Sequence, residues 1–236
     1  MTFPAAAVLR ATGQQYIRQP ANIALLLVLP PLFVLAFASA LSTFSNVLGG
    51  NLNESAGAGL GALWAAALLA GSASYFLLSA SRRADERLLI AGLSPVTLDA
   101  AHALGGAALA AVAGTVGFAI VVATQDVASP LDLWLAIMLG ALAYEALGIT
   151  LAFLVRGDLE GSFLIILVFM FDAFVAGPLG GATGGWPNLF PLHHPSQIVV
   201  DAVLHGNVNR TRYLWGLGYT AALMAISITT HARKLK

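Results

Sequence analysis

The sequence predicts an all-α membrane protein with six transmembrane helices, and three observations lead to that prediction. Of its 236 residues, 58% are apolar and 9% are charged, with a mean hydropathy of +0.84. Soluble domains are about 45–50% apolar and about 25% charged. Long apolar runs recur along the chain, and the basic residues gather on alternate connections between them. This composition excludes a water-soluble globular domain, a disordered chain and a coiled coil.

Six apolar runs are long enough to cross a bilayer, which needs about 20 residues of helix. They cover residues 21–41, 57–80, 98–124, 131–155, 162–178 and 213–230. Two Ser-Pro pairs, at 94–95 and 129–130, are expected to begin the third and fourth spans, because serine favours the N-cap and proline the first helical turn. Gly57 and Gly61 permit close helix packing. The spans use most of the chain, so residues 1–236 are expected to form a single transmembrane domain.

The distribution of basic residues predicts the orientation of these spans. Nine of the eleven Lys and Arg fall on the N-terminal segment, the second and fourth connections and the C-terminal tail, which places these on one side of the membrane. The positive-inside rule makes that side cytoplasmic. We therefore expect a multi-pass plasma-membrane protein with both termini in the cytoplasm and no cleavable signal in the first 19 residues. The basic residues are too few and scattered for nucleic-acid binding.

The first 19 residues are expected to lie in the membrane surface as an amphipathic helix. Arg10, Gln14 and Arg18 recur every four residues and form one polar stripe. Apolar side chains flank this stripe, and its basic charge suits the anionic headgroups of the cytoplasmic leaflet.

Residues 82–93 are expected to form a separate short cytoplasmic helix between the second and third spans. Five charged residues lead into an apolar stretch: Arg82, Arg83, Asp85, Glu86 and Arg87, then Leu88, Leu89 and Ile90. Gly92 is expected to end this helix, because glycine accepts the left-handed conformation that ends many helices. Two interpretations of this helix stay open from composition: a solvated helix at the membrane edge, and a docking helix for a cytoplasmic partner.

The long segment before the last span is expected to form outer re-entrant helices over residues 186–206. Its first half is rich in glycine and proline, and residues 196–205 can form a helix that Gly206 ends. Gln197, Asp201 and His205 share one stripe, and Trp186 suits the aromatic belt at the outer interface. Backbone N–H and C=O groups outside a helix are tolerated at this depth only where protein or water provides their hydrogen-bond partners.

Two acids fall inside predicted spans, Glu145 in the fourth and Asp172 in the fifth. Placing an ionisable residue at this depth costs roughly 2.5–3.5 kcal/mol on insertion scales. We therefore expect each acid to have a specific partner or role. Three readings stay open: a neutral acid in an interhelical hydrogen bond, a place on a substrate pathway, and proton coupling. The pair His193-His194 lacks the spacing of helical metal ligands, so no metal site is expected, and these histidines are expected far above both acids.

The order of these features resembles the ABC type-2 exporter permease family over nearly the whole chain. The residues that carry the resemblance are Arg18-Gln-Pro-Ala-Asn22 and Leu25 to Phe33 in the first span, Glu86 to Pro95 after the second, and Phe190-Pro191 and Val200 to Leu204 before the last. The individual motifs are loose, and the specificity lies in their order.

The resemblance implies a permease subunit without catalytic activity of its own. It would form a homodimer or a heterodimer and recruit two copies of a cytoplasmic ABC ATPase, which would bind ATP and Mg²⁺. The in-plane helix would be a connecting helix, and Asp85, Glu86, Arg87, Leu88 and Leu89 would contact the ATPase. The segment from Trp186 to His205 would gate the exit of a path between protomers, lined by the first, second and fifth spans.

The expected cargo is amphipathic or lipid-like, because the spans offer few fixed charges. Three alternatives stay open. A proton-coupled secondary transporter and an intramembrane enzyme would both use Glu145 and Asp172. A structural membrane scaffold would instead tolerate charge reversal in the loop after the second span. The enzyme requires that these acids and the histidines converge at one depth.

Overall fold

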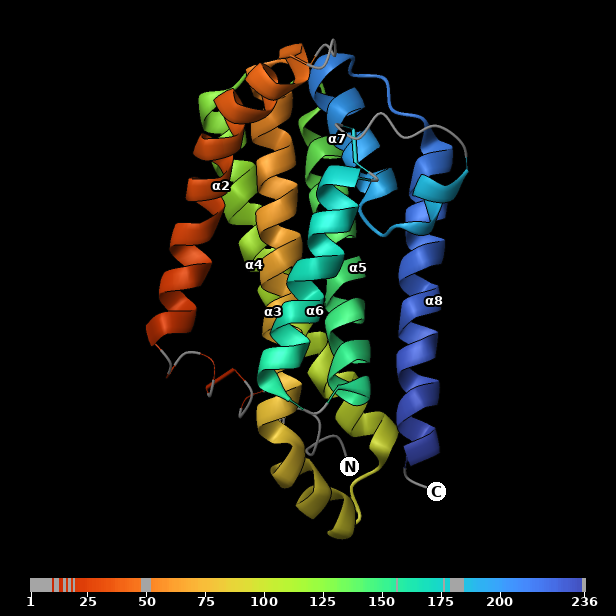
Figure 1. Ribbon diagram of the computed structural model, residues 1–236. Coiled ribbons are helices and arrows are strands. Elements are labelled where there is room, and N and C mark those ends of the chain that lie inside the picture. Colours follow the sequence, from red (N-terminus) through yellow and green to blue (C-terminus); the bar gives the residue numbers. More distant parts are fainter. Residues whose placement is uncertain are drawn as a thin grey trace.

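The computed structural model describes residues 10, 13, 14, 16, 18, 20–47, 52–155, 157–175, 177–178 and 185–234 (Figure 1). Within these residues the fold is all-helical and contains no strand. The helices are α2 (Pro20–Val47), α3 (Glu54–Ile90), α4 (Pro95–Thr124), α5 (Pro130–Leu154), α6 (Asp158–Met170), α7 (His193–Leu204) and α8 (Arg210–Lys234). A π-helical segment η1 (Phe171–Val175) continues α6, and a 3₁₀ turn η2 (Trp186–Leu189) precedes α7.

Four of these helices are long and apolar enough to cross a membrane: Ile23–Val47, Glu54–Ile90, Val96–Thr124 and Pro130–Leu154. They indicate a multi-pass membrane protein. They coincide with the first four predicted spans, whereas the structure does not show the expected total of six. The fifth predicted span is not one continuous α-helix, because α6 has 13 residues and then widens into η1. The sixth coincides with α8, whose first turn carries two arginines.

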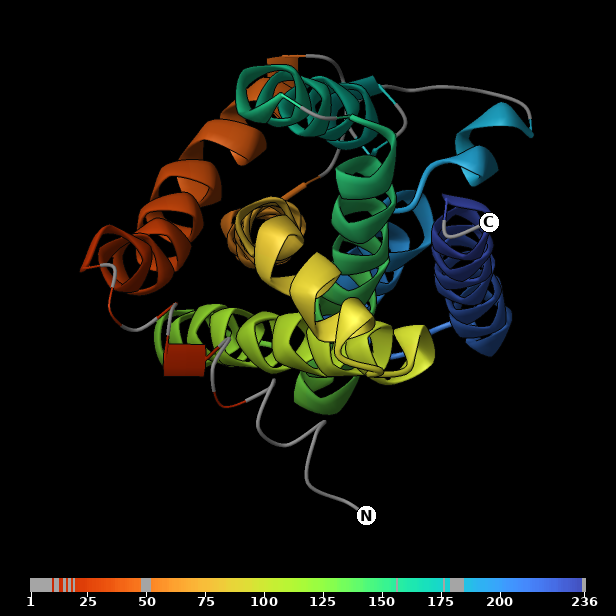
Figure 2. The same cartoon turned by 90° about the horizontal axis from the view of Figure 1, so that it is seen from below.

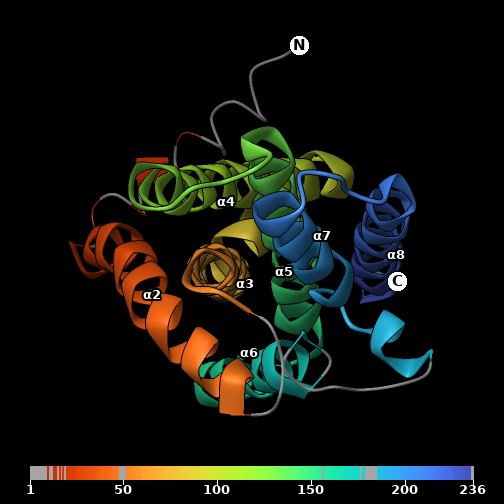
Figure 3. The same ribbon diagram turned by 90° about the horizontal axis from the view of Figure 1, so that it is seen from above.

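Helix α3 forms the centre of the bundle. Figure 3 shows it enclosed by α2, α4, α5, α6 and α7, and it contacts each of these five helices. In its most apolar stretch 83% of the residues are buried, compared with 11% for α2. Its side chains Leu60, Leu63 and Trp64 form the middle of the main core. Any displacement of α3 must therefore shift the packing of most of the molecule.

Glycines bring α3 close to its neighbours. A Cβ atom at Gly57 would lie 2.6 Å from the Phe37 carbonyl oxygen of α2, and one at Gly61 would lie 2.5 Å from that of Phe33. The close packing predicted for this pair is confirmed. On the other side of α3, a Cβ atom at Gly148 of α5 would overlap the Gly71 carbonyl oxygen. Backbone contact of this kind is how small residues join membrane helices.

The two Ser-Pro pairs begin helices as predicted. Helix α4 starts at Pro95 after the N-cap Ser94, and α5 starts at Pro130 after Ser129. Neither serine makes a capping hydrogen bond to the backbone. The Ser129 hydroxyl donates instead to the Asp132 carboxylate at 2.6 Å. The fixed φ of proline is therefore the main signal at these starts.

The expectation of a separate helix over residues 82–93 is wrong, because α3 runs without a break to Ile90. No proline or glycine interrupts residues 72–91, and most of them favour helix. The last turns of α3 nevertheless run obliquely across the lower end of the bundle (Figure 2). Gly92, with φ of +91°, ends the helix as predicted. The N–H groups of Gly92 and Leu93 donate to the carbonyl oxygens of Leu89 and Leu88, which is a Schellman motif.

The expected re-entrant segment contains η2 and α7. Helix α7 begins at His193, three residues before the predicted start, and ends before Gly206, which has φ of +65°. Its buried residues include Ile198, Val199 and Ala202, and it packs on α5 and α3. Most of the expected in-plane helix over residues 1–19 lies outside the described residues. Where the chain is described there, Arg10 and Arg18 are exposed and Tyr16 is buried.

Candidate functional sites: the tip of α3 and two buried acids

The C-terminal end of α3, residues 82–90, forms what we call the α3 tip. Its outward side carries both charge and apolar surface at the lower end of the bundle. Glu86 and Arg87 are exposed. Leu88 is exposed as well, and the Ile90 side chain is 87% exposed. This mixture of exposed charge and apolar surface fits both a helix at the membrane edge and a docking helix.

The inward side of the α3 tip is fixed to α4 and α5. Asp85 accepts a hydrogen bond from the Ser81 hydroxyl at 2.6 Å, and its Oδ2 lies 3.1 Å from His102 Nε2 of α4. Arg82 donates to the carbonyl oxygens of Ala152 and Val155, at 2.6 and 2.8 Å. It thereby satisfies the last carbonyls of α5, as basic residues do at helix C-termini. Of the five residues predicted to contact an ATPase, Glu86, Arg87 and Leu88 are exposed, whereas Asp85 and Leu89 are half-buried.

Glu145 is fully buried between α3, α4 and α5. Among the described residues, neither carboxyl oxygen has a hydrogen-bond partner. The Ala107 N–H lies near the carboxyl, but that amide is inside α4 and the contact does not meet hydrogen-bond geometry. The Ser74 hydroxyl of α3 also lacks a partner in this part of the chain. A Cβ atom at Gly106 would lie 2.6 Å from Glu145 Oε1 and 2.6 Å from Ser74 Oγ, so both oxygens converge on one point of α4.

Asp172 is equally buried but fully bonded. Its Oδ2 accepts a hydrogen bond from the Tyr144 hydroxyl of α5 at 2.9 Å. Both of its oxygens accept from the Leu192 N–H, at 3.0 and 3.1 Å. Asp172 lies in the π-helical segment η1, and Leu192 is the N-cap of α7. This carboxyl therefore ties the end of α6 to α5 and to the start of α7, and its arrangement is that of a structural joint.

The two acids do not come together. Tyr144, which binds Asp172, directly precedes Glu145 on α5, and consecutive helical side chains point about 100° apart. They therefore reach different neighbours. The expectation that the outer histidines lie far above both acids is wrong for Asp172, because Leu192 directly precedes His193 and His194. The chain folds α7 back into the bundle, which sequence spacing cannot reveal. This geometry does not supply the single converged site that an intramembrane enzyme requires.

Of the predicted outer residues, Asp201 and His205 lie together at the upper end of the bundle, whereas Trp186 packs elsewhere, on Phe190. Asp201 of α7 forms an ion pair with Arg212 of α8. His205 Nδ1 lies 3.8 Å from the other oxygen of Asp201, one turn along α7. The Trp186 ring is exposed and packs edge-on against Phe190, with 5.7 Å between ring centroids. The Asp201–Arg212 pair thus fixes α7 to the start of α8.

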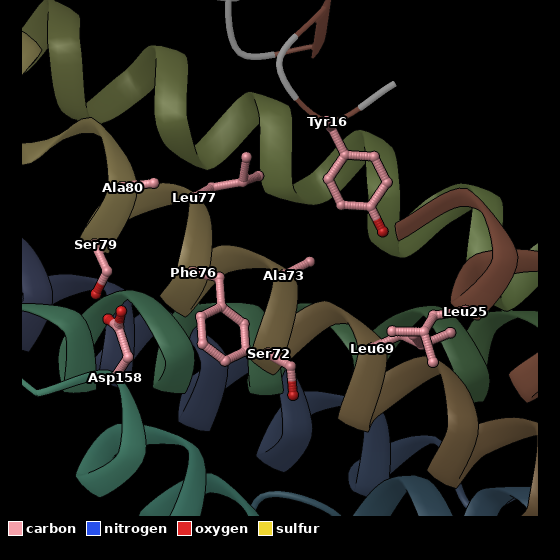
Figure 4. A pocket seen from close by; sticks show the side chains of 10 residues that line it. All are labelled: Tyr16, Leu25, Leu69, Ser72, Ala73, Phe76, Leu77, Ser79, Ala80 and Asp158. Atoms are coloured by element: carbon pink, nitrogen blue, oxygen red, sulfur yellow. The ribbon is translucent and has the colours of Figure 1, made fainter. Parts of the chain in front are cut away.

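A pocket of about 410 Å³ opens between α2, α3 and α6 (Figure 4). Its lining includes three polar side chains that the sequence analysis did not single out: Ser72, Ser79 and Asp158. Figure 4 shows Ser79 and Asp158 at one end of the pocket, and Leu25 and Leu69 at the other. The sequence could have shown that Ser72 and Ser79 share one face of a helix, because they are seven residues apart. It could not have shown that this face lies next to the start of α6, because that is a tertiary contact.

Comparison with known proteins gave no match: no family model matches this chain, and no curated protein matches it significantly. Within the described part of the chain, no group of three or more His, Asp and Glu side chains could hold a metal ion.

Proposed function

We propose that this chain is the transmembrane permease subunit of an ATP-driven ABC exporter. One observation carries the proposal: a surface suited to a cytoplasmic partner is part of the most buried helix of the bundle. The exposed side of the α3 tip offers Glu86, Arg87 and the 87% exposed Ile90. The same helix, without a break, reaches the core around Trp64. The order of segments that resembles the ABC type-2 exporter permeases supports the same reading.

A rigid central helix is a suitable lever. Force applied to the α3 tip is carried along α3, and also through the Asp85–His102 contact to α4 and through Arg82 to the end of α5. Close-packed interfaces switch between discrete arrangements rather than deform smoothly. A partner that changes shape with bound nucleotide would therefore bias the arrangement of several helices at once. ATP and Mg²⁺ would be bound by that partner, present in two copies.

The pocket between α2, α3 and α6 supports an amphipathic or lipid-like cargo. It lies between the first, second and fifth predicted spans, and its lining mixes polar side chains, such as Ser79 and Asp158, with apolar ones, such as Leu25 and Leu69. A molecule that has both polar and apolar parts matches this mixed lining. The pocket walls also bear exposed apolar side chains on their outer faces, such as Leu35 of α2 and Phe163 of α6. A second permease protomer would cover these faces and complete the path.

The proposed subunit lies in the plasma membrane with six spans, α6 with η1 and α8 being the fifth and sixth. Its termini and the α3 tip are cytoplasmic, as the basic residues favour. Arg10 and Arg18 would face anionic headgroups from an in-plane connecting helix. Trp186, Asp201 and His205 would belong to the outer gate.

The test is a pull-down from native membranes in a gentle detergent. Wild type is compared with a chain carrying Glu86→Arg and Arg87→Glu, which preserves net charge while reversing the exposed pair. Asp126→Arg is the control, because this exposed acid lies in the connection between α4 and α5, which is at the opposite end of the bundle. Partners are identified by mass spectrometry, and ATP hydrolysis is measured in each eluate.

We expect an ABC ATPase with wild type and with Asp126→Arg, and loss of both the ATPase and the hydrolysis with the charge-reversed chain. The three chains should give the same melting temperature, since the exchanged residues are exposed. Failure to recover an ATPase with any of the chains would refute the proposal. Equal recovery with all three would refute the assignment of the interface to the α3 tip.

A further inference from the structure

A second cavity, of about 140 Å³, lies one helical turn below the Glu145 site. The three residues that converge on that site are Ser74, Gly106 and Glu145. Four residues further toward the lower end of each helix are Leu78, His102 and Ile149, and all three line the cavity. Residues four apart share a helix face. The cavity is therefore continuous with the α3–α4–α5 interface that holds the Glu145 carboxyl.

The unsatisfied polar atoms of the structure gather along this same interface. Seven buried side-chain nitrogen or oxygen atoms in the described residues lack a hydrogen-bond partner. Four of them are here: both Glu145 oxygens, Ser74 Oγ and His102 Nδ1. A buried polar atom without a hydrogen-bond partner destabilises the folded state. So many at one place indicate that they have partners from solvent.

The cavity is large enough to hold that solvent, although seven of its ten lining residues are apolar. A buried water needs roughly 10–15 Å³ of space open to a water-sized probe, together with two to four polar partners. The cavity exceeds that several-fold, and its lining includes Asp99, His102 and Ser227. It also reaches Val96 and Ala100, which are exposed on the first turns of α4 at the lower end of the bundle.

We propose that Glu145 is a proton-binding site inside the membrane, loaded from the lower end of the bundle through this hydrated cavity and His102. The entering proton passes along cavity water to His102 Nδ1, the ring nitrogen without a partner, while Nε2 stays in contact with Asp85. Nδ1 then gives the same proton up toward the Glu145 carboxylate, which returns the His102 ring to its starting form. One proton is thus moved from the lower side to Glu145, and no other group changes its charge.

The titratable groups around Glu145 leave His102 as its neighbour on the cavity side. On α3 these groups are Tyr75, whose hydroxyl donates to the Gly157 carbonyl oxygen at 2.7 Å, and Asp85, which contacts His102. On α4 they are Asp99 and His102, which line the cavity, and on α5 Tyr144; Tyr219 of α8 interacts with Asp172 instead. Tyr144 donates to Asp172, so the Asp172 joint is separate from the proposed route. Asp172 thus plays no part in the proton transfer.

The test is infrared spectroscopy of the purified chain in lipid nanodiscs while the pH is changed. A protonated buried carboxyl gives a carbonyl-stretch band well separated from carboxylate bands, and this band shifts in D₂O. Wild type is compared with Glu145→Gln and with Asp172→Asn. We expect a titrating band in wild type and in Asp172→Asn, and its loss in Glu145→Gln. Ser74→Ala keeps the acid and is expected to shift the band, because the hydroxyl lies beside the carboxyl.

The route is tested by the rate at which that band exchanges with D₂O. We expect His102→Leu to slow the exchange several-fold while the band itself remains, and His205→Leu, at the other end of the bundle, to leave the rate unchanged.

A band absent from wild type, or present in Glu145→Gln, would overturn the proton site. An unchanged exchange rate in His102→Leu would overturn the route, and a band abolished by added sodium at constant pH would assign the site to a metal cation instead. None of these results depends on recovery of an ATPase, so the two proposals fail independently.

Discussion

Asp172 and Glu145 are both fully buried, both lie in predicted spans and both contact α5 or belong to it, yet their surroundings are opposite. Asp172 accepts hydrogen bonds from two donors, the Tyr144 hydroxyl and the Leu192 N–H, and the N–H is shared between both carboxyl oxygens. Glu145 accepts none from the described residues, and it faces Ser74 and the Cα of Gly106.

The difference comes from the backbone around each acid. The Asp172 joint lies where helices are interrupted, with the π-helical segment on one side and the turn before α7 on the other. Backbone N–H groups at such interruptions have no partner within a helix and can donate to a carboxyl. Glu145 faces the interiors of α3 and α4, where each N–H is already bonded within its own helix. A buried acid at a helix break is therefore structural, whereas one between unbroken helices depends on side chains, water or a proton.

The largest expected effect is that of Asp172→Ala. This substitution leaves the Tyr144 hydroxyl and the Leu192 N–H buried without an acceptor, at about 2–6 kcal/mol in the free energy of unfolding. Reversible unfolding in detergent micelles measures that free energy. Glu145→Ala is the matched control, and it leaves no donor without an acceptor. Equal destabilisation by the two substitutions would contradict the contrast between the acids.

Gly106→Ala is expected to destabilise the bundle by about 1–3 kcal/mol, because its Cβ atom would press on Glu145 Oε1 and Ser74 Oγ. Combining it with Glu145→Ala removes one of the two obstacles, so the double variant should be more stable than the sum of the single effects predicts. A double-mutant cycle measures this coupling. The control is Gly218→Ala in α8, where no atom lies within 4 Å of the new Cβ. Additive effects at Gly106 and Glu145 would show that the two residues are not in contact.

Glu145→Leu is expected to leave stability unchanged or raise it by about 1 kcal/mol, since an apolar group of similar size replaces unsatisfied oxygens. Asp172→Leu should instead destabilise, because it removes the acceptor for two donors. Melting temperatures of the two variants in the same detergent compare them directly. A strong loss of stability in Glu145→Leu would show that this carboxyl has a hydrogen-bond partner. Glu145 would then be a structural residue, as Asp172 is.

The smallest effect is a pH dependence near the Asp172 joint. His194 lies outside the spans, and burial, with smaller contributions from His193 and Arg212, lowers its pKa below the usual 6.5. The unfolded chain therefore binds more protons than the folded one as the pH falls through 6.5. The contribution of His194 to stability is complete above about pH 6.5 and is lost as the pH falls toward the lowered pKa.

His194→Phe should flatten this part of the stability profile while keeping the ring that stacks on Trp215, with 6.0 Å between centroids in the native pair. Melting temperatures at a series of pH values, for the variant and wild type, provide the measurement. An identical profile for both chains would show that His194 does not titrate differently on folding.

Much of the fold could be predicted from residue order. The Ser-Pro pairs located the starts of α4 and α5, and Gly92 and Gly206 located two helix ends. The boundary between the second span and the following helix could not be predicted, because a change from apolar to charged residues does not interrupt a helix. The break at Asp172 was hidden for a related reason: residues 162–178 read as one apolar run, and the Leu192 N–H that supports the π-helical segment comes from 20 residues away.

The candidate sites also combine features that the sequence predicts with features that only the structure shows. The sequence by itself determined that Glu145 and Asp172 are buried among apolar residues and that the segment after residue 81 combines charge with apolar side chains. These follow from composition and from the cost of exposing apolar surface to water. Only the tertiary structure decided which acid is bonded, that the α3 tip belongs to the central helix, and that a cavity lies one turn below Glu145. Hydrogen bonds and cavities depend on how side chains of separate helices meet, and residue spacing within one helix does not specify those meetings.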